Sequence, residues 1–170
     1  YASYIKNLNT PTIVKTGSGI LDATNLGGTF ASNNGVGYTA YFGNNAYNIQ
    51  QGAATIGNQY SNSTLGNIAL SNGATVTISF SGTPTYSGVI SGNGNVVYTT
   101  TATATISGSN TYTGSTTISG TAIVMGASTH YTNGVVDYSP LGISPVVSLA
   151  NVATASLALG ANSIELYALS

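Results

Sequence analysis

Few residues of the chain could carry acid–base or nucleophilic chemistry. Its 170 residues include two cationic side chains, three carboxylates and one histidine. The histidine is His130, with Asp137 the nearest carboxylate after it. A Ser–His–Asp site needs these groups to converge on one nucleophile, and no serine here lies in a nucleophile-elbow sequence. We therefore expect His130 to be a loop residue and the chain not to be an enzyme.

The chain also has few of the carboxylates that a glycoside-hydrolysing or calcium-binding site needs. Glycoside hydrolysis requires two carboxylates within about 10 Å of each other, and calcium-binding β-repeats place an Asp in each repeat. The carboxylates here are spread along the chain at Asp22, Asp137 and Glu165. We expect no metal site and no cofactor.

The composition excludes several classes of partner. Gly, Thr, Ser and Asn number 22, 25, 21 and 18, which is about half of the chain, whereas charged residues are 3%. Two cations cannot neutralise a row of phosphates, so nucleic acid and anionic lipid surfaces are excluded as partners. No apolar run is long enough for a membrane-spanning helix. A hydrophobic content of 42% with a net charge of −1 favours a folded chain over a disordered one.

Apolar and hydroxyl side chains alternate along much of the chain. In the run 74–80, Ala74, Val76, Ile78 and Phe80 would share one face, which is typical of a half-buried strand. Similar patterns predict strands near 101–106, 116–118, 121–125, 135–136, 146–149 and 163–169, and the Ala/Leu-rich run 148–159 is the one weak helix candidate. Frequent Asn-Gly pairs predict tight turns. Such turns suit antiparallel hairpins and solenoid corners alike, so both a β-sandwich and a β-helix remain open.

A repeated tetrapeptide favours the solenoid. Thr85-Tyr86-Ser87-Gly88 recurs further along the chain as Thr111-Tyr112-Thr113-Gly114. Repeats of roughly 20 to 30 residues that are rich in Gly and Asn are typical of solenoid coils. The spacing of the two tetrapeptides predicts about 26 residues per coil.

The segment 85–126 carries a longer pattern. It reads TYSGVISGNG, then a strand, then ISGSNTYTGSTTI and a closing Gly-Thr pair. This resembles the autotransporter passenger-associated β-strand repeat of bacterial surface proteins, as does the KTGSGIL piece at 15–21. The resemblance implies a right-handed parallel β-helix that is exported and displayed outside a bacterial cell; the motif carries no catalytic residues. Its marker residues here are Tyr86, Gly88, Gly92, Gly94, Asn110, Tyr112 and Gly114.

An aromatic cluster lies among Asn and Gln residues in the first half of the chain. It consists of Tyr38, Tyr41, Phe42, Tyr47 and Tyr60. Tyrosine with amides could stack on glycans, could form a subunit interface, or could be ordinary core and loop. The sequence leaves these three interpretations open.

The near absence of charge points to self-association. Strands rich in Val, Ile and Thr lack the Lys residues that usually protect sheet edges, and an open β-helix has an edge at each end. Head-to-tail stacking of such edges grows filaments. A terminal segment could also be donated to a neighbour; the best donor is 1–14, with Tyr4, Ile5, Ile13 and Val14, and the runner-up is 163–170.

We therefore expect residues 1–170 to form a single all-β domain, a right-handed parallel β-helix, with an antiparallel sandwich or jelly-roll fibre subunit as the alternative. The predicted function is a structural subunit of a self-assembling filament or layer at the bacterial cell surface, with other copies of the chain as partners. The alternative is a monomeric adhesin or passenger fragment that contacts glycans on surfaces or other cells.

Overall fold

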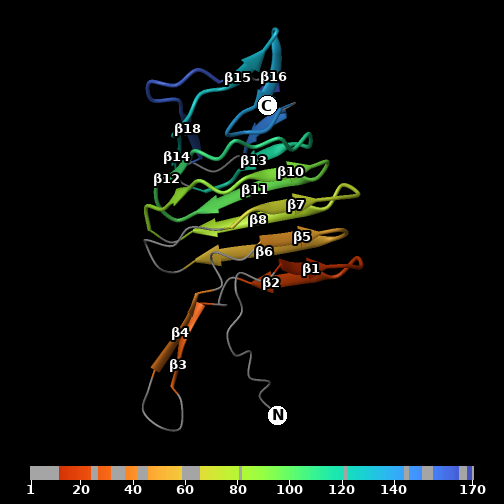
Figure 1. Cartoon of the computed structure of the whole chain (residues 1–170). Coiled ribbons are helices and arrows are strands. Elements are labelled where there is room, and N and C mark those ends of the chain that lie inside the picture. Colours follow the sequence, from red (N-terminus) through yellow and green to blue (C-terminus); the bar gives the residue numbers. More distant parts are fainter. Residues whose placement is uncertain are drawn as a thin grey trace.

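The computed structural model is a stack of short β-strand coils along one axis (Figure 1). It describes residues 12–23, 27–31, 37–41, 46–58, 66–80, 82–120, 122–143, 146–150, 155–164 and 168–169. The regular elements in these ranges are all strands. Within them, no helix is long and apolar enough to cross a membrane.

Three parallel sheets form the faces of the stack. The first is ordered β1-β5-β7-β10, with bounds Thr12–Lys15, Ala46–Ile49, Ile68–Leu70 and Ile90–Gly92. The second is ordered β19-β17-β13-β11-β8-β6-β2, with bounds Ala168–Leu169, Val146–Leu149, Thr116–Ile118, Asn95–Thr100, Thr75–Phe80, Ala53–Asn58 and Ile20–Ala23. The third is ordered β18-β14-β12-β9, with bounds Ser156–Ala158, Ala122–Met125, Ala104–Ile106 and Thr85–Tyr86.

Parallel pairing decides between the two predicted folds. Every pair within these three sheets is parallel, and neighbouring strands come from successive coils. The predicted parallel β-helix is confirmed, and the antiparallel sandwich is wrong. The weak helix candidate at 148–159 is also wrong, because its described residues include the end of β17 and all of β18.

The coil is shorter than the repeated tetrapeptide predicted. The side chain of Asn110 bonds to Ile90 of the coil below, 20 positions earlier, and that of Asn67 bonds to Val89, 22 positions later. The tetrapeptide misled because its two copies occupy different faces: Tyr86 lies in β9, whereas Tyr112 lies before β13 in a segment that bonds to β10. The spacing of the two copies is therefore one coil plus the step from one face to the next, and not the coil length.

Two antiparallel hairpins lengthen individual coils. One consists of β3 and β4, with bounds Gly27–Ala31 and Gly37–Tyr41, and the other of β15 and β16, with bounds His130–Thr132 and Val135–Tyr138. Where they are inserted, paired strands are much further apart in the sequence, as β1 is from β5 and β14 is from β18. The hairpins leave the parallel stacking on either side intact.

The core follows the period of two. In β8, Val76 and Ile78 point inward and are fully buried, whereas Thr75 and Thr77 are only partly covered. This confirms the inward face predicted for Ala74, Val76 and Ile78; the side chain of Phe80 lies outside the described ones. Stacked coils put the same alternation on every face, because each strand lies in register with the next.

Glycine and alanine occupy the corner that precedes four inner strands of the seven-stranded sheet, β6, β8, β11 and β13. The corner residues are Gly52, Ala74, Gly94 and Gly114, and each lies one position before a residue that is in register with the next coil. A Cβ on Gly114 would overlap the carbonyl oxygen of Gly94, and one on Gly94 would overlap that of Ala74. The coils approach so closely here that only very small residues fit.

Candidate functional site

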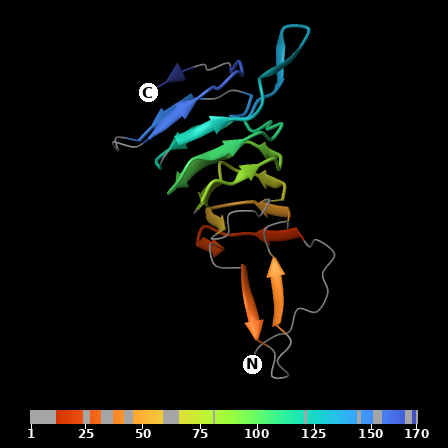
Figure 2. The same cartoon turned by 90° about the vertical axis from the view of Figure 1, so that its left-hand side faces the viewer.

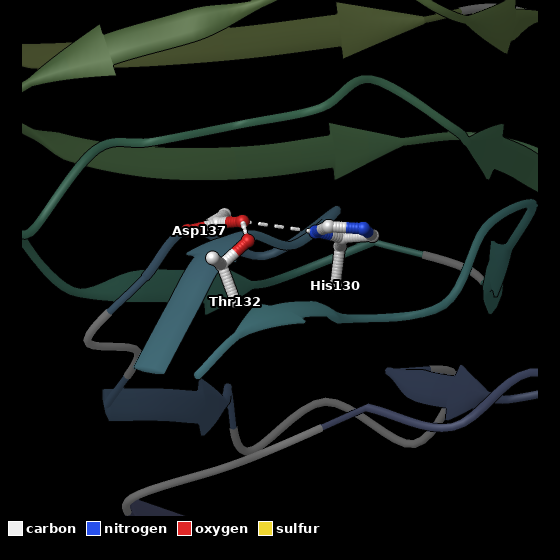
Figure 3. A network of polar contacts seen from close by, with 3 residues as sticks. All are labelled: His130, Thr132 and Asp137. Atoms are coloured by element: carbon white, nitrogen blue, oxygen red, sulfur yellow. Dashed lines mark hydrogen bonds and ion pairs between the residues drawn. The ribbon is translucent and has the colours of Figure 1, made fainter. Parts of the chain in front are cut away.

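The β15–β16 hairpin brings together His130 and Asp137. Nδ1 of His130 lies 3.0 Å from Oδ2 of Asp137, and the hydroxyl of Thr132 donates to the same carboxylate oxygen (Figure 3). The imidazole also stacks on the ring of Tyr138, with centroids 4.8 Å apart and planes inclined by 6°. The structure therefore places these residues in one polar network on an antiparallel hairpin, where the sequence predicted a loop histidine.

Asn-Gly turn chemistry builds this hairpin. Asn133 and Gly134 have φ angles of 52° and 81°, the positive values that a tight two-residue hairpin turn requires. The turn pairs Thr132 with Val135 and Tyr131 with Val136, and a β-bulge then shifts the register so that His130 faces Tyr138. Asp137 and Tyr138 both lie opposite His130 at this bulge, and both contact the imidazole.

The network orients the imidazole and holds no nucleophile at its outer nitrogen. The hydroxyl of Thr132 contacts the carboxylate and not Nε2, whereas a Ser–His–Asp site needs the hydroxyl on the opposite side of the ring. The side chains of His130 and Asp137 are 50% and 39% exposed, so water screens the pair. Among the described residues, no group of three or more His, Asp or Glu side chains could hold a metal ion.

The aromatic cluster does not form one surface. Tyr47 is 2% exposed and points into the core from β5, and burial raises the pKa of its hydroxyl. For Tyr47 the interpretation as part of a glycan-contacting or subunit-contacting face is therefore wrong. Tyr38 and Tyr41 lie in β4, and Phe42 and Tyr60 lie outside the described residues.

The predicted donor strand belongs in part to its own coil. Ile13 and Val14 lie in β1, which pairs in parallel with β5 of the same chain. Tyr4 and Ile5 lie outside the described residues. Donation of the whole segment 1–14 would require β1 to leave its own sheet, so end-to-end contact is the simpler of the two predicted modes of assembly.

The repeat-motif residues are structural. Tyr86 and Tyr112 are buried in the core, where the hydroxyl of Tyr86 donates to the carbonyl oxygen of Gly66. Asn110 ties neighbouring coils: its Oδ1 accepts from the backbone N–H of Ile90 at 2.7 Å, and its Nδ2 donates to the carbonyl oxygen of Pro140 at 2.6 Å. Of the motif glycines, Gly94 and Gly114 form the corner described above, Gly92 ends β10 with a φ of 99°, and Gly88 lies beneath Gly108 in the next coil.

The ammonium of Lys15 is held against backbone carbonyl groups at the edge on which it lies. Lys15 ends β1, the last strand of its sheet, and its Nζ donates to the carbonyl oxygens of Thr16, Gly17 and Gln51 at 3.1, 2.7 and 3.1 Å. An edge-protecting lysine keeps its ammonium in solvent beyond the strand. Lys15 instead caps carbonyl groups of its own and the next coil, a role that sequence inspection missed because these carbonyls come together only when coils stack.

The two ends of the solenoid expose parts of the core. At the N-terminal end, Leu21 of β2 is only partly buried against the core cluster. Val14 and Ile20 lie on the outward-facing side of the edge strands β1 and β2 and are 55% and 77% exposed. At the other end, Leu157 of β18 is partly buried and Leu159 is 40% exposed. Between these ends the inward side chains are buried almost completely. The described apolar stack therefore continues to both ends of the molecule.

Comparisons with protein-family models, curated proteins and solved structures found no match to this chain. The resemblance of 85–126 to the autotransporter passenger repeat stays a prediction.

Proposed function

We propose that this chain is a structural subunit of an extracellular filament or surface layer, in which copies join end to end. The observation that carries the proposal is the seven-stranded sheet, which runs the length of the molecule and ends in β2 on one side and β19 on the other. All of its strands are parallel. Placing β2 of one copy against β19 of the next would extend the sheet in the same sense.

Apolar burial at the junction supports the same arrangement. A neighbouring copy would cover Leu21 at one end and Leu157 at the other, both of which extend the core cluster. Burying this apolar surface at the junction favours association. The partly buried end residues would then occupy the environment that the inner coils already give their own leucines and isoleucines.

The charge distribution does not oppose stacking. The chain has a net charge of −1, and Lys15, the lysine nearest the N-terminal edge in the described part of the chain, is bound to backbone carbonyl groups. Two copies would therefore meet with little repulsion. Assembly should depend only weakly on ionic strength, because screening acts on charges that are almost absent here.

Electron microscopy of the purified chain in dilute neutral buffer tests the proposal. We expect filaments with a regular axial repeat, and we expect Ile20→Lys to shorten or abolish them, because it places a charge on the edge strand β2, beside the strand that a second copy would add. The matched control is Thr117→Lys, which adds the same charge to the side wall at β13. Circular dichroism of both variants verifies that the solenoid is folded.

Isolated particles of the unmodified chain at all concentrations would overturn self-assembly and favour the monomeric glycan-contacting adhesin. Equal loss of filaments in Ile20→Lys and Thr117→Lys would show that added charge, and not the blocked edge, is responsible.

A further inference from the structure

The two hairpins are inserted at equivalent points of different coils. The β3–β4 hairpin lies between β2 and β5, just before the chain re-enters the sheet that contains β1, β5, β7 and β10. The β15–β16 hairpin lies between β14 and Ser139, which bridges to Asn110. Asn110 in turn bonds to Ile90 of that same sheet. Both hairpins therefore emerge from the part of the coil that leads back to this sheet.

The hairpins extend past opposite ends of the molecule. In both views the β3–β4 hairpin reaches beyond β1 and β2, and the β15–β16 hairpin reaches beyond β18 and the C-terminal strand (Figures 1 and 2). Two copies stacked end to end would thus send hairpins toward each other from the same part of the coil. Each overhang would run alongside the junction instead of lying between the stacked coils.

The β15–β16 hairpin carries apolar side chains that its own fold leaves in solvent. Val135 is 68% exposed and Tyr131 is 47% exposed. The two lie on opposite faces of the hairpin, because Tyr131 pairs with Val136 and Val135 pairs with Thr132, whose hydroxyl contacts Asp137. Each face of the hairpin therefore presents one exposed apolar side chain.

The edge strands alone offer little contact. In the described part of the C-terminal end, β18 has three residues and β19 has two, and a junction made only of these described edges would form few backbone hydrogen bonds. Stable protein interfaces bury roughly 800 Å² on each partner. Side-to-side contact between the overhanging hairpins would add the area that such short edges lack.

We propose that the β15–β16 hairpin of one copy docks against the β3–β4 hairpin of the next copy and clasps the junction. This inference rests on the proposed end-to-end assembly and names the surface that joins its subunits. The partner is a second copy of this chain.

Cross-linking can test the clasp directly, because the chain has no cysteine. Val135→Cys is mixed with Thr39→Cys, a position in β4, under assembly conditions, and a bismaleimide linker is added. We expect a cross-linked dimer that contains one copy of each variant. The control mixes Val97→Cys, on the wall strand β11 in the middle of the solenoid, with Thr39→Cys, and we expect no such dimer.

A second measurement removes the apolar contact. The double variant Tyr131→Ser/Val135→Ser should raise the critical concentration for assembly about tenfold, whereas Val97→Ser should leave it unchanged. Filaments that form normally but give no Val135–Thr39 cross-link would overturn the clasp and leave end-to-end assembly standing. If the unmodified chain forms no filaments, the proposed function fails and the clasp fails with it.

Discussion

The hydroxyl oxygen of Tyr112 lies 2.5 Å from Oγ1 of Thr116, four residues later in the chain, and both side chains are buried in the core. The Thr116 hydroxyl also donates to the carbonyl oxygen of Leu141 at 3.3 Å. The nearby hydroxyl of Tyr98 is equally buried but has no hydrogen-bond partner among the described residues. Two tyrosines in one core thus differ in whether their polar atom is satisfied.

Replacing each tyrosine by phenylalanine should separate these two situations. Tyr98→Phe removes an unsatisfied buried hydroxyl, so we expect the free energy of unfolding to stay the same or rise by about 1–2 kcal/mol. Tyr112→Phe removes a hydrogen bond, so we expect a fall of about 0.5–1.5 kcal/mol. Urea denaturation followed by circular dichroism measures both. A larger loss for Tyr98→Phe than for Tyr112→Phe would contradict the assignment of Tyr98 as the unsatisfied residue.

Alkaline pH should destabilise the fold through these same residues. Burial raises the pKa of Tyr98, Tyr86 and Tyr112 above the ordinary 10.0. Above about pH 10, the unfolded chain therefore loses tyrosine protons that the folded chain retains, and stability falls as the pH rises. The expected slope is roughly 1.4 kcal/mol per pH unit for each such tyrosine, while these groups contribute no pH dependence below that range.

Urea midpoints measured from about pH 8 to about pH 12 check this slope, with tyrosinate absorbance as a second signal. Tyr98→Phe should show a shallower decline than the unmodified chain, because one shifted group is absent. A midpoint that stays constant across this range would show that the buried tyrosines ionise as readily in the fold as in the unfolded chain.

Asn110 should be far more important to stability than an exposed asparagine with a similar bond. Asn110→Ala leaves the backbone N–H of Ile90 and the carbonyl of Pro140 without their side-chain partner in a buried region. We expect a loss of about 2–4 kcal/mol. The matched control is Asn67→Ala: Oδ1 of Asn67 accepts from the N–H of Val89, but the bond is exposed and water can replace it. A loss below about 1 kcal/mol is expected there, and equal losses would mean that burial at Asn110 is unimportant.

Adding a single methyl group at the corner where the coils approach each other should strongly lower the free energy of unfolding. Gly114→Ala would place a Cβ against the carbonyl oxygen of Gly94, which is backbone and cannot move aside without separating the coils. We expect a loss of about 3 kcal/mol. Gly19→Ala is the control, since a Cβ there meets nothing within 4 Å. Differential scanning calorimetry of both variants measures the difference; a Gly114→Ala protein as stable as Gly19→Ala would show that the coils have room at this corner.

The Asn-Gly pairs show which features of a turn the local sequence predicts and which it does not. Asn72-Gly73 and Asn133-Gly134 both adopt the positive φ angles that Asn-Gly pairs favour. The first pair turns a solenoid corner between β7 and β8, whereas the second closes the β15–β16 hairpin. The dipeptide therefore predicted a tight turn in both places and could not distinguish a parallel coil from an antiparallel pair.

The amino-acid sequence by itself determined the all-β character of the chain and which side chains face the core, because alternation with a period of two is a local property of each strand. Only the tertiary structure decided the coil length, the burial of Tyr47, the capping of carbonyl groups by Lys15 and the meeting of His130 with Asp137. The reason is physical. Register between parallel strands is set by contacts between residues that lie a whole coil apart, as Ile90 and Asn110 do, and no local pattern of turns or hydrophobicity encodes which residues those will be.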